Sequence, residues 1–191
     1  MTKNPRQRMI ESAAVLIREK GVEGTSFSDV VDASGAPRGS IYHYFPRGKA
    51  QLVEEATRYG TDFVVAGLAA SLEDANVAAS VRKFGMFYAE ILRDSDFTAG
   101  CPVLAAALEG ERSPAARDAA GQGFRQWEEM LSEGLRREGL KTEDAAPLAT
   151  LIVSSLEGAV ALSRAQRTTR PLEAVIDQIE TLIDAATGRA A

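Results

Sequence analysis

The sequence of 191 residues predicts an all-α protein of about nine helices. Apolar residues recur along most of the chain at spacings of three and four, which is the period of a helix that buries one face. No segment shows the strict alternation of apolar and polar residues that is typical of a half-buried strand. Serine, proline and glycine stand where such helices would begin and end. Together these observations favour helices that pack on helices.

The first predicted helix runs from Pro5 to Lys20 and is closed by Gly21. Its buried stripe consists of Ile10, Ala13, Ala14 and Ile17. Arg6 and Arg8 fall near its start. They either approach a sugar-phosphate backbone or are simply solvated, and both alternatives stay open at this point.

The second helix is predicted to start at Ser26, whose hydroxyl can cap it. Asp29, three residues on, completes an S-x-x-D capping box. Its apolar face consists of Phe27, Val30 and Val31. Gly35 can take a left-handed backbone at low cost, so it should end this helix and turn the chain.

The third helix is predicted to begin at Pro37, which suits the first turn of a helix. Ile41 and Phe45, four residues apart, should pack inward. The outer face then carries Arg38, Gly39, Ser40, Tyr42, His43 and Tyr44. A helix, a short turn and a second short helix with a polar outer face form a helix-turn-helix, in which the second helix enters a DNA groove.

From Gly21 to Lys49 the chain closely resembles the TetR family of transcriptional regulators. The matching residues are Gly21-x-x-Gly24-Thr25, then Gly39-Ser40-Ile41-Tyr42-x-x-Phe45, and finally Lys49. This combination of glycines, tyrosine, phenylalanine and lysine at fixed offsets is specific. The chain departs from the family pattern at Pro37, where Ser or Thr is usual, and at Ser34, where Ala is usual.

The outer face and the resemblance together predict the DNA-binding residues. They are Thr25, Ser26, Arg38, Gly39, Ser40, Tyr42, His43, Tyr44 and Lys49. Tyr42 and His43 should contact phosphates or base edges, because Ile41 and Phe45 hold the opposite face inward. Lys49 stands at the start of the next helix, where free backbone N–H groups favour an anion.

The same periodicity and stop signals predict the remaining helices. They lie at 49–72, 76–93, 103–110, 114–138 and 142–166, and from Pro171 onward. A helix-turn-helix head is therefore expected over residues 1–47 and a helical regulatory and dimerisation body over residues 48–191. The long helix after Lys49 would link the two.

Composition excludes several classes of protein. The chain is 45% hydrophobic and 26% charged, as in soluble globular proteins. No run approaches the roughly 18 consecutive apolar residues of a membrane span, and the polar N-terminus shows no secretory signal, so a cytoplasmic protein without membrane contact is expected. The net charge of −5 divides into +3 over residues 1–50 and −8 over the rest, which fits a basic head on an acidic body.

Catalytic and metal-binding groups are scarce. The single histidine, His43, lies on the helix-turn-helix, and the single cysteine, Cys101, lies far from it in the sequence. One His and one Cys do not supply a zinc site, and no glycine-rich phosphate-binding loop is present. No enzyme activity, metal or other cofactor is expected, and one cysteine allows no internal disulfide.

Several body residues are candidates for binding a small molecule. The aromatic side chains of Phe63, Phe84, Tyr88 and Trp127 either fill a core or line an apolar pocket. Glu157 is the only charged residue between Asp144 and Arg164. Because burying a carboxylate is costly, it is expected to pair with Arg164, with a partner subunit or with a cationic ligand.

Cys101 lies between Gly100 and Pro102 at the start of a short apolar helix. It is either an oxidation sensor or a small side chain packed under a loop. The stretch GCPVLAAALE resembles the LmrA/YxaF-like branch of the TetR family, which implies a structural or pocket-lining part for Cys101 and Leu104.

The resemblance implies a repressor that binds a palindromic operator as a homodimer and is released by a small lipophilic molecule, aromatic or cationic. It also implies that the last two helices form the dimer interface. The wide apolar stripe of the last helix, which includes Ile176 and Ile179, is expected to have no other partner in its own chain. The alternative is a DNA-binding architectural module with a filled core and no ligand.

Overall fold

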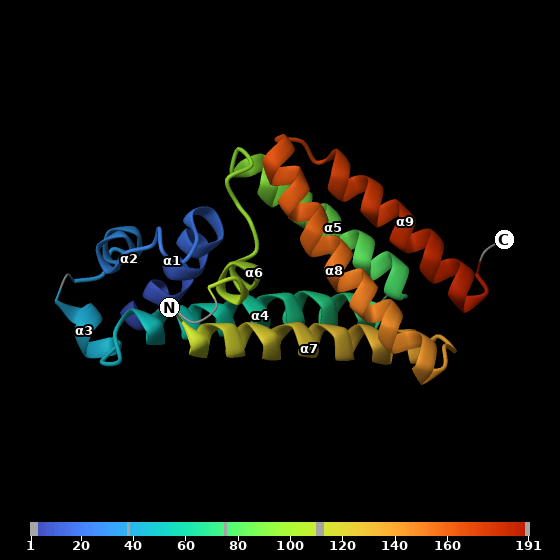
Figure 1. Ribbon diagram of the computed structural model, residues 1–191, viewed down its shortest axis with the longest axis horizontal. Helices are drawn as coiled ribbons and strands as arrows, with labels where there is room; N and C mark the ends of the chain where they lie inside the picture. Colours follow the sequence, from blue (N-terminus) through green and yellow to red (C-terminus); the bar gives the residue numbers. More distant parts are fainter. Residues whose placement is uncertain (1–3, 38, 75, 110–112, 190–191) are drawn as a thin grey trace. The chain divides into compact units, whose positions relative to one another are not determined.

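The computed structural model describes residues 4–37, 39–74, 76–109 and 113–189, and within these ranges it contains nine α-helices and no strand (Figure 1). The helices are α1 (Pro5–Lys20), α2 (Phe27–Ser34), α3 (Ser40–Tyr44), α4 (Lys49–Asp74), α5 (Val77–Asp94), α6 (Pro102–Ala107), α7 (Pro114–Arg137), α8 (Thr142–Gln166) and α9 (Arg170–Thr187). The all-α prediction is confirmed, and most helix ends lie within a few residues of those expected.

The predicted capping box at the start of α2 is present. The Ser26 hydroxyl accepts a hydrogen bond from the backbone N–H of Asp29 at 3.1 Å, and the Asp29 carboxylate accepts one from the backbone N–H of Ser26 at 2.9 Å. At the other end, Gly35 is left-handed with φ 62°. Local sequence therefore defines both ends of this helix.

The third helix begins later than expected, at Ser40 instead of Pro37. The backbone N–H of Ser40 donates to the Pro37 carbonyl at 2.9 Å, and the Ser40 hydroxyl donates to the same oxygen at 2.6 Å. These two bonds close a tight turn before the helix. Pro37 consequently precedes α3 and does not occupy its first turn.

The chain forms two compact units. The first unit comprises Met1–Asp62 and Gly100–Gly123, and the second comprises Phe63–Ala99 and Phe124–Ala191. Both α4 and α7 thus contribute to each unit. The packing places the beginning of α4, α6 and the beginning of α7 with the helix-turn-helix, so the compact units do not coincide with the division expected after residue 47. A functional division into head and body stays a prediction.

Large apolar side chains of α1, α4 and the segment around α3 are fully buried in the first unit. The largest of them that are fully buried are Met9, Ile17, Ile41, Phe45 and Leu52. The backbone N–H of Gly100 donates to the carbonyl of Arg18 at 2.8 Å, which joins the segment before α6 to α1. This core holds α3 in place by its inner face, as the spacing of Ile41 and Phe45 predicts.

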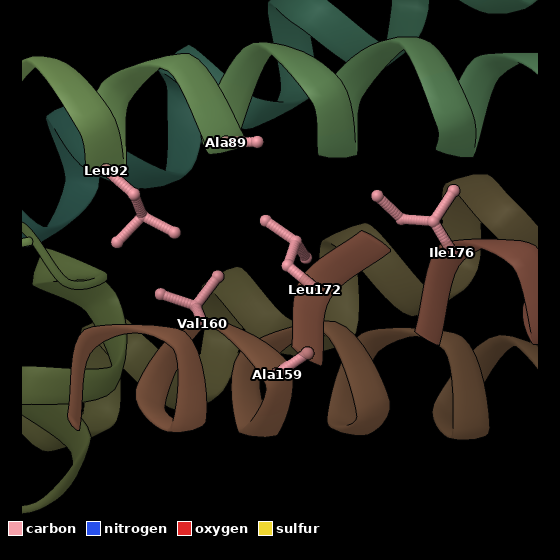
Figure 2. Packing of buried hydrophobic residues seen from close by; sticks show 6 residues of the cluster. All are labelled: Ala89, Leu92, Ala159, Val160, Leu172 and Ile176. Atoms are coloured by element: carbon pink, nitrogen blue, oxygen red, sulfur yellow. The ribbon is translucent and has the colours of Figure 1, made fainter. Parts of the chain in front are cut away.

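Three helices of the second unit surround a buried apolar cluster. Figure 2 shows side chains from α5, α8 and α9 directed into a common interior. The cluster consists of Ala89, Leu92, Ala159, Val160, Leu172 and Ile176. A Cβ atom at Gly85 would lie 2.4 Å from Cδ1 of Ile176, so a larger residue there would force the Ile176 side chain to shift.

Arginines of α5 pair with acidic residues of α9. The Arg82 guanidinium donates to Asp177 at 2.6 Å and also to Glu180, and the hydrogen bond with Glu180 is the main reason that the pKa of Arg82 is raised. Further along α5, Arg93 pairs with Glu173 at 3.0 Å. These pairs reinforce the apolar contact between the same two helices.

The expectation that Ile176 and Ile179 lack a partner in their own chain is wrong. Both are buried within the chain, with 0% and 3% of their surface exposed. α5 and α8 cover this stripe of α9, because the second unit packs α9 on both of them. If α9 contacts a second copy, it does so through a different face.

By length and composition, α8 is the one helix among the described residues that could cross a membrane. A count of consecutive apolar residues misses this property because Ser154, Ser155 and Glu157 interrupt the run. The core helix of a soluble protein has the same composition, and Ala159 and Val160 of α8 do pack into the buried cluster.

Candidate nucleic-acid interface

The outer face of α3 is open to solvent. Tyr42 is 70% exposed and His43 is also exposed, whereas Ile41 and Phe45 on the inner face are only 2% and 0% exposed. Tyr44 is half-buried, and its ring meets the His43 ring in an edge-type contact with a centroid distance of 5.4 Å. The helix therefore holds an aromatic and imidazole surface outward on a firmly anchored backbone.

Tyr42 does not stand alone on this surface. The ring of Phe27, at the first position of α2, meets it edge to face, with a centroid distance of 5.6 Å and an interplanar angle of 79°. The spacing put Phe27 on one apolar face with Val30 and Val31, and its side chain is half-buried whereas theirs are buried. Helical spacing within α2 could not show this contact, because the partner ring belongs to another helix.

Hydroxyl groups at the predicted site are engaged within the chain. Thr25 is buried, with 3% of its surface exposed, and its hydroxyl donates to the Gly21 carbonyl at 2.8 Å. The Ser26 hydroxyl donates to the Asp29 carboxylate at 2.7 Å. This bond is the largest cause that lowers the pKa of the Asp29 carboxyl from its usual 3.8, and the bond from the Ser26 backbone N–H is the second. Ser40, half-buried, caps the turn at Pro37 as described above.

Gly39 lies at the N-terminus of α3 with an ordinary right-handed backbone, φ −77° and ψ −12°. A Cβ atom built there would meet no other atom within 4 Å. Neither backbone conformation nor packing within the chain therefore requires glycine at this position. Arg38, the preceding predicted contact, lies outside the described residues.

The cationic residues singled out in the first unit are Lys49, Arg6 and Arg8. Lys49 is half-buried at the first position of α4. Arg6 pairs with Glu55 at 2.6 Å and lies 5.4 Å from the centre of the Phe45 ring, and Arg8 donates to the Ser34 carbonyl at 3.0 Å. Arg6 and Arg8 thus help to hold the helix-turn-helix together, a role that neither alternative included, and their approach to a sugar-phosphate backbone stays a prediction.

The predicted effector-binding aromatics lie in the second unit. They form ring pairs whose centroids are 5.3 to 6.1 Å apart, namely Phe63–Phe87, Phe84–Tyr88 and Phe124–Trp127. Trp127 is only 4% exposed, whereas Phe63 is 45% exposed. Glu157 is half-buried on α8. A role of these residues in binding a ligand stays a prediction.

Cys101 and Leu104 belong to the first unit. The Cys101 thiol is buried, and its Sγ accepts a hydrogen bond from the backbone N–H of Leu104 at 3.4 Å, so it caps the short helix α6. An oxidation sensor needs an accessible thiolate, and this position is buried. In the ranges that the structure describes, no three His, Cys, Asp or Glu side chains are grouped so as to hold a metal ion.

Comparisons with known proteins agree with this architecture. Residues 9–56 match the model of the bacterial regulatory proteins of the tetR family, and residues 77–178 match the LmrA/YxaF-like C-terminal domain of transcriptional regulators. A relative from Mycobacterium tuberculosis (strain ATCC 25618 / H37Rv), the HTH-type transcriptional regulator Rv0196, is 38% identical over 190 residues, which cover 94% of each chain. The HTH-type transcriptional repressor DhaR of Mycobacterium sp. (strain GP1) is 27% identical over 181 residues, covering 91% of this chain and 89% of its own.

Among solved structures, a TetR transcriptional regulator from Legionella pneumophila superposes with a TM-score of 0.85 at 24% identity. The match covers 95% of this chain and 98% of that one, and it supports the fold. The helix-turn-helix geometry, the two family models and the 38% identical relative lead to one conclusion. The chain belongs to the TetR family of transcriptional regulators, with a C-terminal domain of the LmrA/YxaF-like type.

Proposed function

We propose that this chain is a ligand-responsive transcriptional repressor that binds a palindromic DNA operator as a homodimer. The observation that carries the proposal is the outer face of α3, where Tyr42 is 70% exposed and His43 is exposed beside it. This face belongs to the second helix of a helix-turn-helix, the element that lies in the major groove in proteins of this architecture.

Each predicted contact has a distinct physical part in DNA binding. Tyr42 and His43 reach base edges or phosphates from the groove-facing side of α3. Gly39 has no side chain, so the backbone at the start of α3 can approach the duplex closely. Lys49 supplies charge at the N-terminus of α4, where free N–H groups also attract a phosphate. The rest of the predicted set consists of Thr25, Ser26, Arg38, Ser40 and Tyr44.

We propose that two copies meet through the outer faces of α8 and α9. Leu151 and Leu162 of α8 and Leu182 of α9 are 46%, 52% and 47% exposed. On the same helix α8, Gly158 is exposed and a Cβ there would meet nothing within 4 Å. Glycine inside a helix costs about 1 kcal/mol relative to alanine, a cost that close approach of a second helix would explain.

A two-fold axis through this face makes the interface self-complementary and gives the dimer two copies of α3 for two half-sites. Occupation of the operator would then exclude other proteins from the same DNA, which is repression. The relative DhaR is an HTH-type transcriptional repressor, which supports this direction of regulation. A regulator of this kind acts in the cytoplasm, where bacterial DNA lies.

The proposed effector is a small lipophilic molecule, aromatic or cationic, bound in the body. Phe84, Tyr88 and Trp127 supply aromatic rings, and Glu157 carries a negative charge that suits a cationic compound. Phe63 is a further candidate in the same unit. The effector releases DNA only if it prefers a dimer geometry that does not fit the operator.

Selection from random DNA tests the first part of this proposal. The protein should enrich duplexes with two-fold symmetric half-sites, and an anisotropy titration should give two chains per duplex. Tyr42→Ala should weaken binding by about tenfold or more, the effect of losing one good contact. Leu108→Ala is the control, because Leu108 is 77% exposed at the end of α6. Undiminished DNA affinity of Tyr42→Ala would refute the placement of α3 in the DNA groove.

Fluorescence tests the effector. Trp127 is the only tryptophan in the chain, so quenching reports on its surroundings alone. Lipophilic aromatic compounds that quench it should also release the selected duplex, and Trp127→Ala should weaken that release. If a broad set of neutral and cationic compounds neither quenches nor releases, the alternative of an architectural DNA-binding module with a filled core is favoured.

A further inference from the structure

The contact between Phe27 and Tyr42 joins the two helices of the helix-turn-helix at the surface. The rings meet edge to face at 5.6 Å and 79°, an arrangement that the aromatic quadrupoles favour. Phe27 is half-buried, so part of its surface is covered. Tyr42, at 70% exposure, has most of its surface in solvent.

Hydrogen bonds of the capping box hold the backbone next to Phe27. Phe27 directly follows Ser26, whose hydroxyl and backbone N–H are both tied to Asp29 by the capping box. On the other side, Tyr42 follows Ile41, which is 2% exposed in the core. Two anchored backbone positions therefore present two rings to each other, and the remaining freedom lies in the side-chain torsions.

We infer that Phe27 is a positioning residue that holds the Tyr42 ring in the orientation in which it contacts DNA. The inference rests on the proposed function and names a residue outside the predicted contact set. A largely exposed tyrosine that rotates freely must lose that freedom on binding, which weakens the complex. A neighbouring ring that restricts the rotation in the free protein removes part of this loss.

This role differs from a structural one in a measurable way. If Phe27 acts through Tyr42, its substitution matters only while Tyr42 is present. If Phe27 merely stabilises the helix-turn-helix, its substitution weakens DNA binding to the same extent with or without the tyrosine. The two rings are in contact, so the effects of the two substitutions on the free energy of DNA binding are not expected to be additive.

A double-mutant cycle measured by anisotropy on the selected duplex tests this. Phe27→Leu keeps an apolar side chain at the start of α2 but removes the ring, and it should weaken binding by about three- to tenfold. In the Tyr42→Ala background the same change should weaken binding less than about twofold. Phe27→Tyr, which retains a ring, should restore the affinity of the original protein. The salt dependence should not change, because no charge is altered.

Circular dichroism and melting curves of each variant show whether the fold is kept. Equal weakening by Phe27→Leu in both backgrounds, no weakening at all, or failure of Phe27→Tyr to restore affinity would overturn the inference. If Phe27→Leu does not fold, the comparison of Phe27→Tyr with Phe27→Met in both backgrounds decides in the same way. A different result, full affinity of Tyr42→Ala alone, would refute the placement of α3 and thereby the proposed function itself.

Discussion

Replacing Leu162 by alanine should weaken the proposed homodimer and leave the fold of each chain intact. Leu162 is 52% exposed on α8, so about half of its side chain is available for burial against a second copy. Full burial of a leucine stabilises by about 1.5–3 kcal/mol, so the exposed half contributes about 1 kcal/mol. A two-fold axis counts the residue twice, which gives about 2 kcal/mol per dimer and about a 30-fold rise in its dissociation constant.

Sedimentation equilibrium over a range of protein concentrations measures this constant directly. Val15→Ala is the matched control, because Val15 on α1 is 40% exposed but lies outside the proposed interface. Leu182→Ala on α9, at 47% exposure, should behave like Leu162→Ala. An unchanged constant for Leu162→Ala, or equal weakening by the Val15 variant, would refute the assignment of α8 to the interface.

Four further substitutions test other parts of the molecule. Gly39→Ala should keep or slightly raise the melting temperature, because a Cβ there meets open space. The same change should weaken operator binding, and an unchanged affinity in a titration would mean that the backbone does not approach DNA at Gly39. Lys49→Ala should weaken operator and random duplexes alike and lower the slope of log K against log salt by about one, and a changed base preference would contradict this. Gly85→Ala should destabilise the chain by about 1–3 kcal/mol in urea unfolding, because the new Cβ would lie 2.4 Å from Ile176 Cδ1. An unchanged urea concentration at the unfolding midpoint would show that α9 moves to accommodate the methyl group. Asp29→Asn should lower the melting temperature at pH 7. Hydrogen bonds from the N-cap serine lower the pKa of the Asp29 carboxyl from 3.8, so the stability that they supply is present above pH 3.8 and is lost when the carboxyl is protonated. The difference in melting temperature between Asp29→Asn and the original protein should therefore shrink as the pH falls below 3.8.

Local sequence predicted those features that depend on neighbouring residues. The capping box of Ser26 and Asp29 and the left-handed Gly35 are confirmed, because each is decided by bonds or backbone angles within a few residues. The inward face of α3 is confirmed for the same reason, since Ile41 and Phe45 are one helical turn apart. Family membership followed from residues at such fixed offsets.

The start of α3 shows where local reasoning ends. Proline is well suited to the first turn of a helix, and on propensity alone Pro37 begins one. Its carbonyl instead accepts two hydrogen bonds from Ser40, one from the backbone and one from the hydroxyl. A sequence pattern does not reveal which of two local hydrogen-bond arrangements the packed chain adopts.

By itself, the sequence determined an all-helical chain with a helix-turn-helix near its N-terminus, together with the family to which it belongs. Only the tertiary structure decided which partner covers each apolar or charged side chain. Periodicity placed Ile176 and Ile179 on one stripe, but α5 and α8 of the same chain cover it, which leaves a different face of α9 for a second copy. Likewise Arg6 meets Glu55 and the Phe45 ring, and Phe27 meets Tyr42. The physical reason is that helical spacing fixes which residues share a face, whereas the neighbour of that face comes from a distant part of the chain and is set by how the helices pack.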